Sequence, residues 1–225
     1  HLKRNRELSK RFDLLIFDWD GTLLDSAGTI VASIQAACAD IGWPVPSREA
    51  ASHIIGLGLK EAIAALFPDM PEAEQPRLAE RYRYHFLAQD HAIPLFDGAE
   101  ELIAELHARG FLLAVATGKA RRGLVRAFEH SGLERYFHAS RTADETFSKP
   151  NPTMLLELLD ELMVDKARAL MIGDTSHDLL MAQNAGVPAL AAGYGAHPAD
   201  SLHAFEPLAV CHRFEDLAEW LRTNA

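Results

Sequence analysis

Short runs of apolar residues recur along the chain, and none of them alternates with polar residues. Unbroken runs of this length are typical of strands that are buried on both faces of a sheet. They predict strands over residues 14–17, 112–116, 169–172 and 188–192.

Between these runs, apolar residues recur at the three- and four-residue spacing of amphipathic helices. The spacing predicts helices over residues 100–109, 123–130, 153–162 and 178–185. Gly110 and Gly186 follow the first and the last of them, where glycine commonly ends a helix. Strands that alternate with helices predict an α/β fold, a doubly wound, Rossmann-like parallel sheet with helices on both faces.

The stretch over residues 27–92 breaks this alternation, because it carries helical stripes and no strand pattern. Pro94 and the Asp-Gly pair that follows it mark the return to the sheet. The pattern therefore predicts two domains. One is an α/β core of residues 12–26 and 93–225, and the other is an inserted all-helical domain of residues 27–92.

Polar residues follow three of the predicted strands at the point where each strand ends. Asp18 and Asp20 come after the first strand, and Thr117 and Asp174 end or follow two later ones. Because ligands bind at the carboxyl ends of strands in an open parallel sheet, we expect these side chains to converge on one crevice. Lys149, in the loop before the helix over 153–162, is a candidate to join them.

Such a cluster favours phosphate chemistry with a metal ion. Carboxylates in one crevice repel one another and are costly to desolvate, and a hard divalent cation such as Mg²⁺ relieves this. The Thr117 hydroxyl, the backbone N–H of Gly118 and the Lys149 ammonium suit phosphoryl oxygens. Phosphoryl transfer depends mainly on positioning and charge neutralisation, which these groups supply.

The charge balance limits the possible partners. The 225 residues carry a formal net charge of -10, which disfavours nucleic acid and anionic membranes as partners. No apolar run approaches the roughly 20 residues of a membrane span. Two cysteines without a CxxC pair fit a reducing compartment, so a cytoplasmic location is expected. The expected partner is a small phosphorylated metabolite. The protein is expected to be a monomer or a homodimer.

Four segments carry a resemblance to a known family. They are DWDGTLLDS at 18–26, VATGK at 115–119, KP at 149–150 and GDTSHD at 173–178. In this order they resemble the four signatures of the haloacid dehalogenase superfamily. The helical insert matches the position of that family's small cap domain. Within the superfamily, the chain looks most like phosphoglycolate-phosphatase-type members.

The resemblance implies roles for the acidic residues. Asp18 would be the nucleophile that forms an aspartyl-phosphate. Asp20 would protonate the leaving alcohol and then activate water against that intermediate. Asp18, the backbone carbonyl of Asp20 and Asp174 would hold Mg²⁺.

The resemblance also implies a phosphoryl-binding set. Thr117, the Gly118 N–H and Lys149 would bind the transferring group. Asp178 would orient Lys149 or a metal-bound water. Lys60 begins a helix after a cap loop, and cap loops of similar enzymes face the active site, so it is a candidate substrate contact.

Two further residues leave alternatives open. Arg121 and Arg122 begin a helix near the pocket, where they either bind an acid group of the substrate or lie on a solvated face. The sequence does not choose between these two interpretations.

An acid at position 20 separates related activities. Relatives that cleave carbon–halogen bonds or phosphonates lack it, since an alkoxide leaving group needs a proton and a halide does not. Asp20 therefore favours a phosphate ester, hydrolysed with Mg²⁺ through an aspartyl-phosphate.

Several other functions remain as alternatives. One is a phosphosugar mutase similar to β-phosphoglucomutase, which passes the phosphoryl group to a second hydroxyl, and another is an inorganic pyrophosphatase. A phospho-accepting receiver domain is disfavoured, because receivers are shorter and lack the helical insert. A non-catalytic binding protein descended from such an enzyme is disfavoured, because both Asp18 and Asp20 are present.

Overall fold

The computed structural model describes residues 9–225, which contain a six-stranded sheet in the order β3-β2-β1-β4-β5-β6. Every neighbouring pair of strands runs parallel. The chain starts at the middle strand and winds outward in both directions, which confirms the predicted doubly wound α/β fold. The strands are β1 (Leu14–Phe17), β2 (Leu112–Thr117), β3 (Ala139–Thr142), β4 (Ala169–Gly173), β5 (Ala189–Ala192) and β6 (Val210–Cys211).

The four predicted strands are present, and β3 and β6 are additional. These two strands form the edges of the sheet. The β3 segment reads Ala-Ser-Arg-Thr and is only partly buried, while β6 has two residues. An edge strand is not covered on all sides, so it needs no continuous apolar run, and the hydrophobic pattern did not reveal it.

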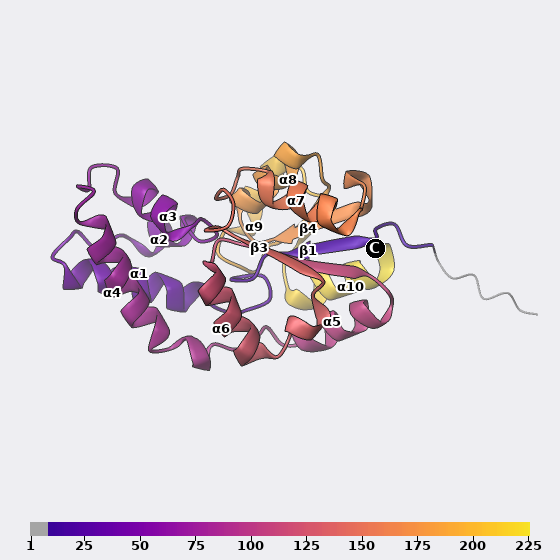
Figure 1. The fold of residues 1–225 in the computed structure, drawn as a ribbon, viewed down its shortest axis with the longest axis horizontal. Helices are drawn as coiled ribbons and strands as arrows, with labels where there is room; N and C mark the ends of the chain where they lie inside the picture. Colours follow the sequence, from indigo (N-terminus) through magenta and orange to yellow (C-terminus); the bar gives the residue numbers. More distant parts are fainter. Residues whose placement is uncertain (1–8) are drawn as a thin grey trace, which may run out of the picture.

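Alternate residues of the central strand β1 pack against two different helical layers. Leu15 and Phe17 belong to an apolar cluster with α5 (Ala99–Ala108), α6 (Arg121–Ser131) and α10 (Phe214–Asn224). Leu14 and Ile16 belong to a second cluster on the opposite face, with α7 (Thr153–Leu162) and α8 (Ser176–Ala185). In Figure 1, α7 and α8 lie above the sheet, and α5 and α10 lie below it.

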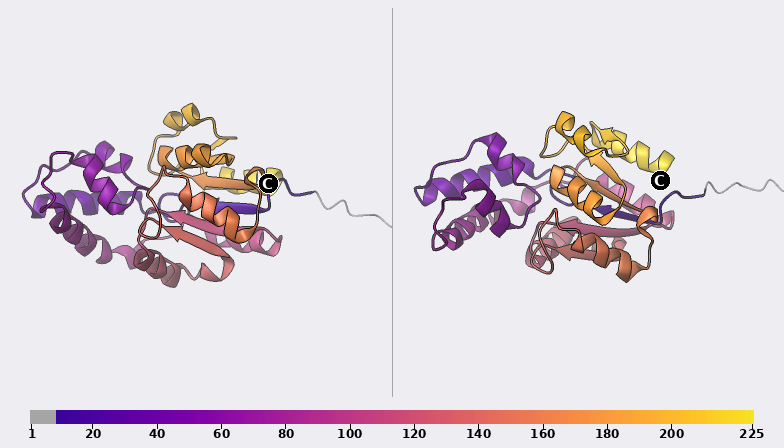
Figure 2. Two further views of the ribbon diagram at one scale, coloured as in Figure 1. Left: turned by 45° about the horizontal axis from the view of Figure 1, so that its top comes forward. Right: turned by 90° about the horizontal axis from the view of Figure 1, so that it is seen from above.

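Four of the helices between β1 and β2 come before α5 in the chain and form a group of their own. They are α1 (Ala27–Asp40), α2 (Arg48–His53), α3 (Leu59–Leu66) and α4 (Gln75–Leu87). They enclose an apolar cluster of their own, which includes Ile34, Ile63 and Leu78. All views show these helices as a group beside the sheet (Figures 1 and 2). The boundaries at residues 27 and 92 remain a prediction.

The two chain crossings between this helical group and the sheet lie side by side. The Asp25 N–H donates to the Pro94 carbonyl over 2.9 Å, and the Phe96 N–H donates to the Leu23 carbonyl over 2.9 Å. Leu24 and Leu95 form an antiparallel bridge between these bonds. The helical group is therefore attached through one short two-stranded connection.

The remaining elements are short. They are η1 (Asp90–Ala92), η2 (Glu134–Tyr136), η3 (Lys166–Arg168), α9 (Ala199–Leu202) and η4 (His203–Phe205). Among residues 9–225, no helix combines the length and apolar character that a membrane crossing requires.

Adjacent leucines of α7 test the packing of the layer above the sheet. Leu155 is fully buried, whereas its neighbour Leu156 is 48% exposed. We expect Leu155→Ala to lower the free energy of unfolding by about 2–5 kcal/mol, because it removes buried apolar volume. Leu156→Ala should change it by less than about 0.5 kcal/mol. Urea denaturation measures both values, and equal losses would contradict this packing.

Candidate active site

Three adjacent strands bring the first polar residues together. Strand β1 lies between β2 and β4, so the ends of these strands meet at the centre of one sheet edge. Asp18 follows β1, Thr117 ends β2 and Asp174 follows β4, and all three are buried. The Asp18 N–H donates to the Ile172 carbonyl of β4 over 2.9 Å, which fixes the turn where β1 ends.

Lys149 joins this group as a buried cation between two acids. Its Nζ lies 3.0 Å from Asp18 Oδ1 and 2.7 Å from Asp178 Oδ1. Burial disfavours the ammonium, but the two carboxylates outweigh this and hold the pKa of Lys149 above its usual value. Burial also favours the neutral form of Asp178, yet Lys149 outweighs it and lowers the pKa of that acid.

The second oxygen of Asp178 accepts hydrogen bonds at the start of helix α8. Its Oδ2 accepts from the Thr175 N–H over 3.1 Å and from the Thr175 hydroxyl over 2.9 Å. The Asp178 N–H donates back to Thr175 Oγ1, so the two residues form a capping box. Asp178 therefore connects the start of a helix with Lys149.

Asp174 is held from two sides. The Thr22 hydroxyl donates to its Oδ1 over 3.0 Å, and the Ala196 N–H donates to its Oδ2 over 2.8 Å. Burial, and then the nearby charge of Asp178, raise the pKa of Asp174 to about 7. Burial and the charges of Asp178 and Asp174 also raise the pKa of Asp18 well above its usual value.

The group of acids fits a hard divalent cation. Oxygen atoms of Asp18, Asp174 and Asp178 lie within 4.8 Å of one another. The oxygens of Asp178 already serve Lys149 and Thr175, whereas Asp18 Oδ2 is buried and accepts no hydrogen bond. Mg²⁺ prefers carboxylate and carbonyl oxygens. Asp174 accepts from two uncharged donors, whereas Asp178 contacts the Lys149 ammonium, so Asp174 and the adjacent Asp18 are the side chains best placed to hold such an ion.

The backbone after Asp20 lies against Asp174. Gly21 has a φ of +78°, and a Cβ at this position would overlap the Asp174 carboxylate. Only glycine allows both the positive φ and this close approach. The turn therefore brings the chain next to Asp20 onto Asp174, where the resemblance predicted a carbonyl ligand.

Asp20 itself has a hydroxyl and an ammonium as neighbours. The Ser26 hydroxyl donates to Asp20 Oδ1 over 2.7 Å, and Lys119 Nζ lies 3.3 Å from Asp20 Oδ2. The sequence predicted no role for Lys119 or Ser26. The sequence offered only one indication, which is that Ser26 lies in the first signature segment and Lys119 in the second. No spacing rule pairs either residue with Asp20.

The helical group packs directly onto the strand ends. A Cβ at Gly118 would overlap the carbonyl oxygens of Gly56 and Leu57, in the loop before α3. The Gly58 N–H donates to the Ser148 hydroxyl over 3.0 Å, next to Lys149. This loop therefore covers one side of the crevice.

A second contact uses the end of α2. The side-chain Nε2 atoms of His177 and His197 both donate to the His53 carbonyl, over 2.6 Å and 2.9 Å. The rings of His53 and His197 stack with centroids 4.9 Å apart. These residues hold the end of α2 against the start of α8.

A cavity of about 1060 Å³ lies between the two parts of the molecule. It is lined by Asp18, Asp20, Thr117, Gly118 and Lys60 among others. The remaining predicted residues, Lys149, Asp174 and Asp178, are buried beside this group. The structure thus brings seven of the eight predicted site residues together and leaves Lys60 on the outer wall, where it is exposed.

Arg121 and Arg122 differ in their surroundings. The Arg121 guanidinium is paired with Glu145 over 2.6 Å and donates to the Ser140 hydroxyl over 2.8 Å. Arg122 is exposed and lines the cavity. Arg121 is therefore engaged within the core, and Arg122 is the one that faces the crevice.

Comparison with known proteins agrees with this geometry. Residues 15–192 match the family of haloacid dehalogenase-like hydrolases, and the chain belongs to that family. This confirms the resemblance and the prediction of a hydrolytic enzyme.

Relatives and solved structures of similar length accompany this match. The chain is 36% identical over 210 residues to "Probable phosphatase IndB" of Dickeya dadantii, covering 91% of each protein. It is 34% identical over 189 residues to the phosphoglycolate phosphatase of Agrobacterium fabrum, covering 81% of each. The fold superposes on a hydrolase from Pseudomonas syringae with a TM-score of 0.86 at 23% identity, over 94% of this chain and 98% of that one.

The raised pKa of Asp174 predicts a pH dependence of metal-free stability. Its folded pKa of about 7 exceeds the ordinary value of 3.8, so its contribution to stability is complete at acidic pH and is lost as the pH rises through 7. Asp18 acts in the same direction. In EDTA, we expect the free energy of unfolding to fall as the pH rises from about 4 to about 7 and to level off above that.

Two variants identify the group responsible. Asp174→Asn should flatten this decline, because an amide does not ionise. Asp160→Asn, at an exposed position of α7, should leave it unchanged. Urea denaturation at a series of pH values gives the slopes, and equal slopes in all three proteins would contradict the assignment.

Proposed function

We propose that this protein is a Mg²⁺-dependent hydrolase of small phosphorylated metabolites, similar to phosphoglycolate phosphatases, that acts through an aspartyl-phosphate on Asp18. The observation that carries the proposal is the state of Asp18. Its Oδ1 is engaged by Lys149 and by the Trp19 N–H, while its buried Oδ2 accepts no hydrogen bond. Asp18 lines the cavity, and one oxygen of its carboxylate has no hydrogen-bond partner.

The first step would use this oxygen as nucleophile. Asp18 Oδ2 forms a bond to phosphorus as the bond from phosphorus to the leaving oxygen breaks. Asp20 donates its proton to the leaving oxygen, so that an alcohol departs rather than an alkoxide. Ser26 and Lys119 position the Asp20 carboxyl for this transfer.

The second step would return Asp18 to its original state. Asp20, now a carboxylate, takes a proton from water, and the water oxygen attacks phosphorus. The bond from phosphorus to Asp18 Oδ2 breaks, which releases inorganic phosphate. The difference from a mutase lies in which hydroxyl attacks at this point.

The surrounding residues would stabilise the charge on the phosphoryl group. Thr117 and the Gly118 N–H offer donors at the cavity, and the Lys149 ammonium keeps Asp18 and Asp178 together despite their mutual repulsion. Bound Mg²⁺, held by Asp18, Asp174 and the Asp20 carbonyl, would supply the positive charge that phosphoryl oxygens require. The phosphatase names of two relatives support this reaction class.

Substitution of the two acids tests the assigned roles. With Mg²⁺ and p-nitrophenyl phosphate, Asp18→Asn should abolish turnover, because an amide is not a nucleophile. Asp20→Asn should lower kcat by about 10²- to 10⁴-fold. Asp69→Asn, on the exposed surface, is the control and should retain full activity.

Phosphate release against time measures these rates. An Asp18→Asn enzyme with wild-type activity would rule out the nucleophile. Stable labelling by acetyl phosphate with little turnover would indicate a phospho-accepting signalling domain instead.

Removal of the metal tests the ion-binding residues independently of turnover. We expect Mg²⁺ to raise the Tm of the metal-free protein, since a ligand at 100 times its Kd stabilises by about 2.7 kcal/mol. Asp174→Asn should largely remove this increase, and Asp69→Asn should preserve it. Thermal unfolding with EDTA or Mg²⁺ gives the comparison, and an equal shift in Asp174→Asn would exclude Asp174 as a ligand.

A further inference from the structure

The cavity above the catalytic residues is far larger than a phosphoryl group needs. Its volume is about 1060 Å³. The walls that the helical group contributes are mainly apolar. They include Ile30 and Ile34 of α1, Ile54 and Leu59 around the loop before α3, and Tyr82 and Phe86 of α4.

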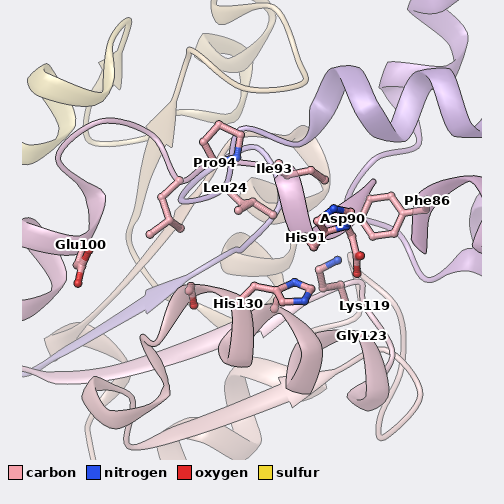
Figure 3. A pocket seen from close by; sticks show the side chains of 13 residues that line it. Leu24, Phe86, Asp90, His91, Ile93, Pro94, Glu100, Lys119, Gly123 and His130 are labelled. Atoms are coloured by element: carbon pink, nitrogen blue, oxygen red, sulfur yellow. The ribbon is translucent and has the colours of Figure 1, made fainter. Parts of the chain in front are cut away.

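An aromatic pair occupies the wall nearest to the acid Asp20. Tyr82 and Phe86 lie one turn apart on α4, and their rings stack with centroids 5.8 Å apart and planes inclined by 14°. Lys119 Nζ lies 4.8 Å from the centroid of Phe86 and 3.3 Å from Asp20 Oδ2. A single ammonium therefore separates the aromatic pair from the residue that would protonate the leaving oxygen. Figure 3 shows Phe86 and Lys119 next to each other, with Asp90 beside them.

The charges of the cavity balance one another. The inner cations are already paired, Lys119 with Asp20 and Arg126 with Asp90 over 3.0 Å. The exposed charged residues of the lining comprise three cations and three acids, so together they create no excess of positive charge. They are Lys60, Arg83 and Arg122, with Glu61, Glu129 and Asp144.

We propose that this cavity selects phosphomonoesters whose leaving group carries an uncharged, planar aromatic ring, seated against Tyr82 and Phe86. The inference rests on the proposed function, because it concerns the alcohol that departs when Asp18 attacks phosphorus. A ring gains free energy by burial against the apolar walls and by packing on the aromatic pair. A small anionic leaving group such as glycolate would leave these walls unfilled and would meet no unpaired inner cation.

The state of Tyr82 agrees with this proposal. Tyrosine is neutral at physiological pH, and burial and the nearby charge of Asp20 raise the pKa of the Tyr82 hydroxyl further above its usual value. Tyr82 therefore lines the cavity as an uncharged aromatic side chain.

Two matched alkyl esters test the preference for a ring. Benzyl phosphate and ethyl phosphate both release a primary alcohol, and only the first carries a ring. With Mg²⁺, we expect kcat/KM for benzyl phosphate to exceed the value for ethyl phosphate and for 2-phosphoglycolate by at least about tenfold. A nucleoside 5′-monophosphate, measured in parallel, shows whether a heterocyclic ring farther from the phosphate is also accepted. A preference for either ring-bearing ester supports the proposal, and no preference for either overturns it.

Variants of α4 locate the preference in the aromatic pair. Phe86→Leu and Tyr82→Leu keep an apolar side chain and remove a ring. Each should lower the ratio of kcat/KM for benzyl phosphate to kcat/KM for ethyl phosphate by about three- to tenfold. Tyr84→Leu is the matched control, because Tyr84 lies on the same helix and is 61% exposed. Equal effects on both esters, or an equal effect of Tyr84→Leu, would overturn the proposal.

Different results would refute the leaving-group preference and the proposed function. Hydrolysis that depends on Asp18 but ignores the ring refutes only the leaving-group preference. Absence of hydrolysis for every ester, or hydrolysis that persists in Asp18→Asn, refutes the proposed function, and the leaving-group preference falls with it.

Discussion

The buried contact of Lys149 with Asp18 and Asp178 is the interaction on which the rest of the site depends. Three charged side chains lie at the sheet edge with almost no access to water. Desolvating charges is costly, and this group is tolerated because the Lys149 ammonium is in direct contact with both carboxylates. Loss of one partner would leave an uncompensated charge in the interior. The site is therefore one unit whose members depend on one another.

This contact also determines what remains available for chemistry. Lys149 engages one oxygen of Asp18, and Thr175 together with Lys149 engages both oxygens of Asp178. The second oxygen of Asp18 is left without a hydrogen-bond partner, in a carboxylate whose orientation is fixed by Lys149 and the Trp19 N–H. Pre-orientation of this kind lowers the cost of reaching the transition state, because little rearrangement accompanies the reaction.

The helical group completes the site from the other side. The loop before α3 lies on Gly118, and the His53 carbonyl accepts bonds from two histidines of the core. The group is attached to the sheet through one short two-stranded connection near Leu24 and Leu95. The helical group thus supplies most of the wall around the leaving-group side of the cavity. Its own apolar cluster is separate from the clusters that cover the sheet.

The fold was largely predictable because the central strands have a strong local signal. Strands β1, β2, β4 and β5 are apolar throughout, since they are covered on both faces, whereas the edge strands β3 and β6 lack such runs. The rule that ligands bind at strand ends was sufficient to select Asp18, Thr117 and Asp174 from the sequence.

The sequence by itself determined the central strands, the helices that alternate with them and the acids at the strand ends, because hydrophobic periodicity and strand-end position are local properties. Only the tertiary structure decided that Lys119 pairs with Asp20 and that Phe86 and Tyr82 form the wall beside them. These contacts join residues far apart in the chain, and they depend on how α4 packs over the crevice. No local pattern encodes that packing, so the shape and charge of the leaving-group side could be learned only from the folded chain.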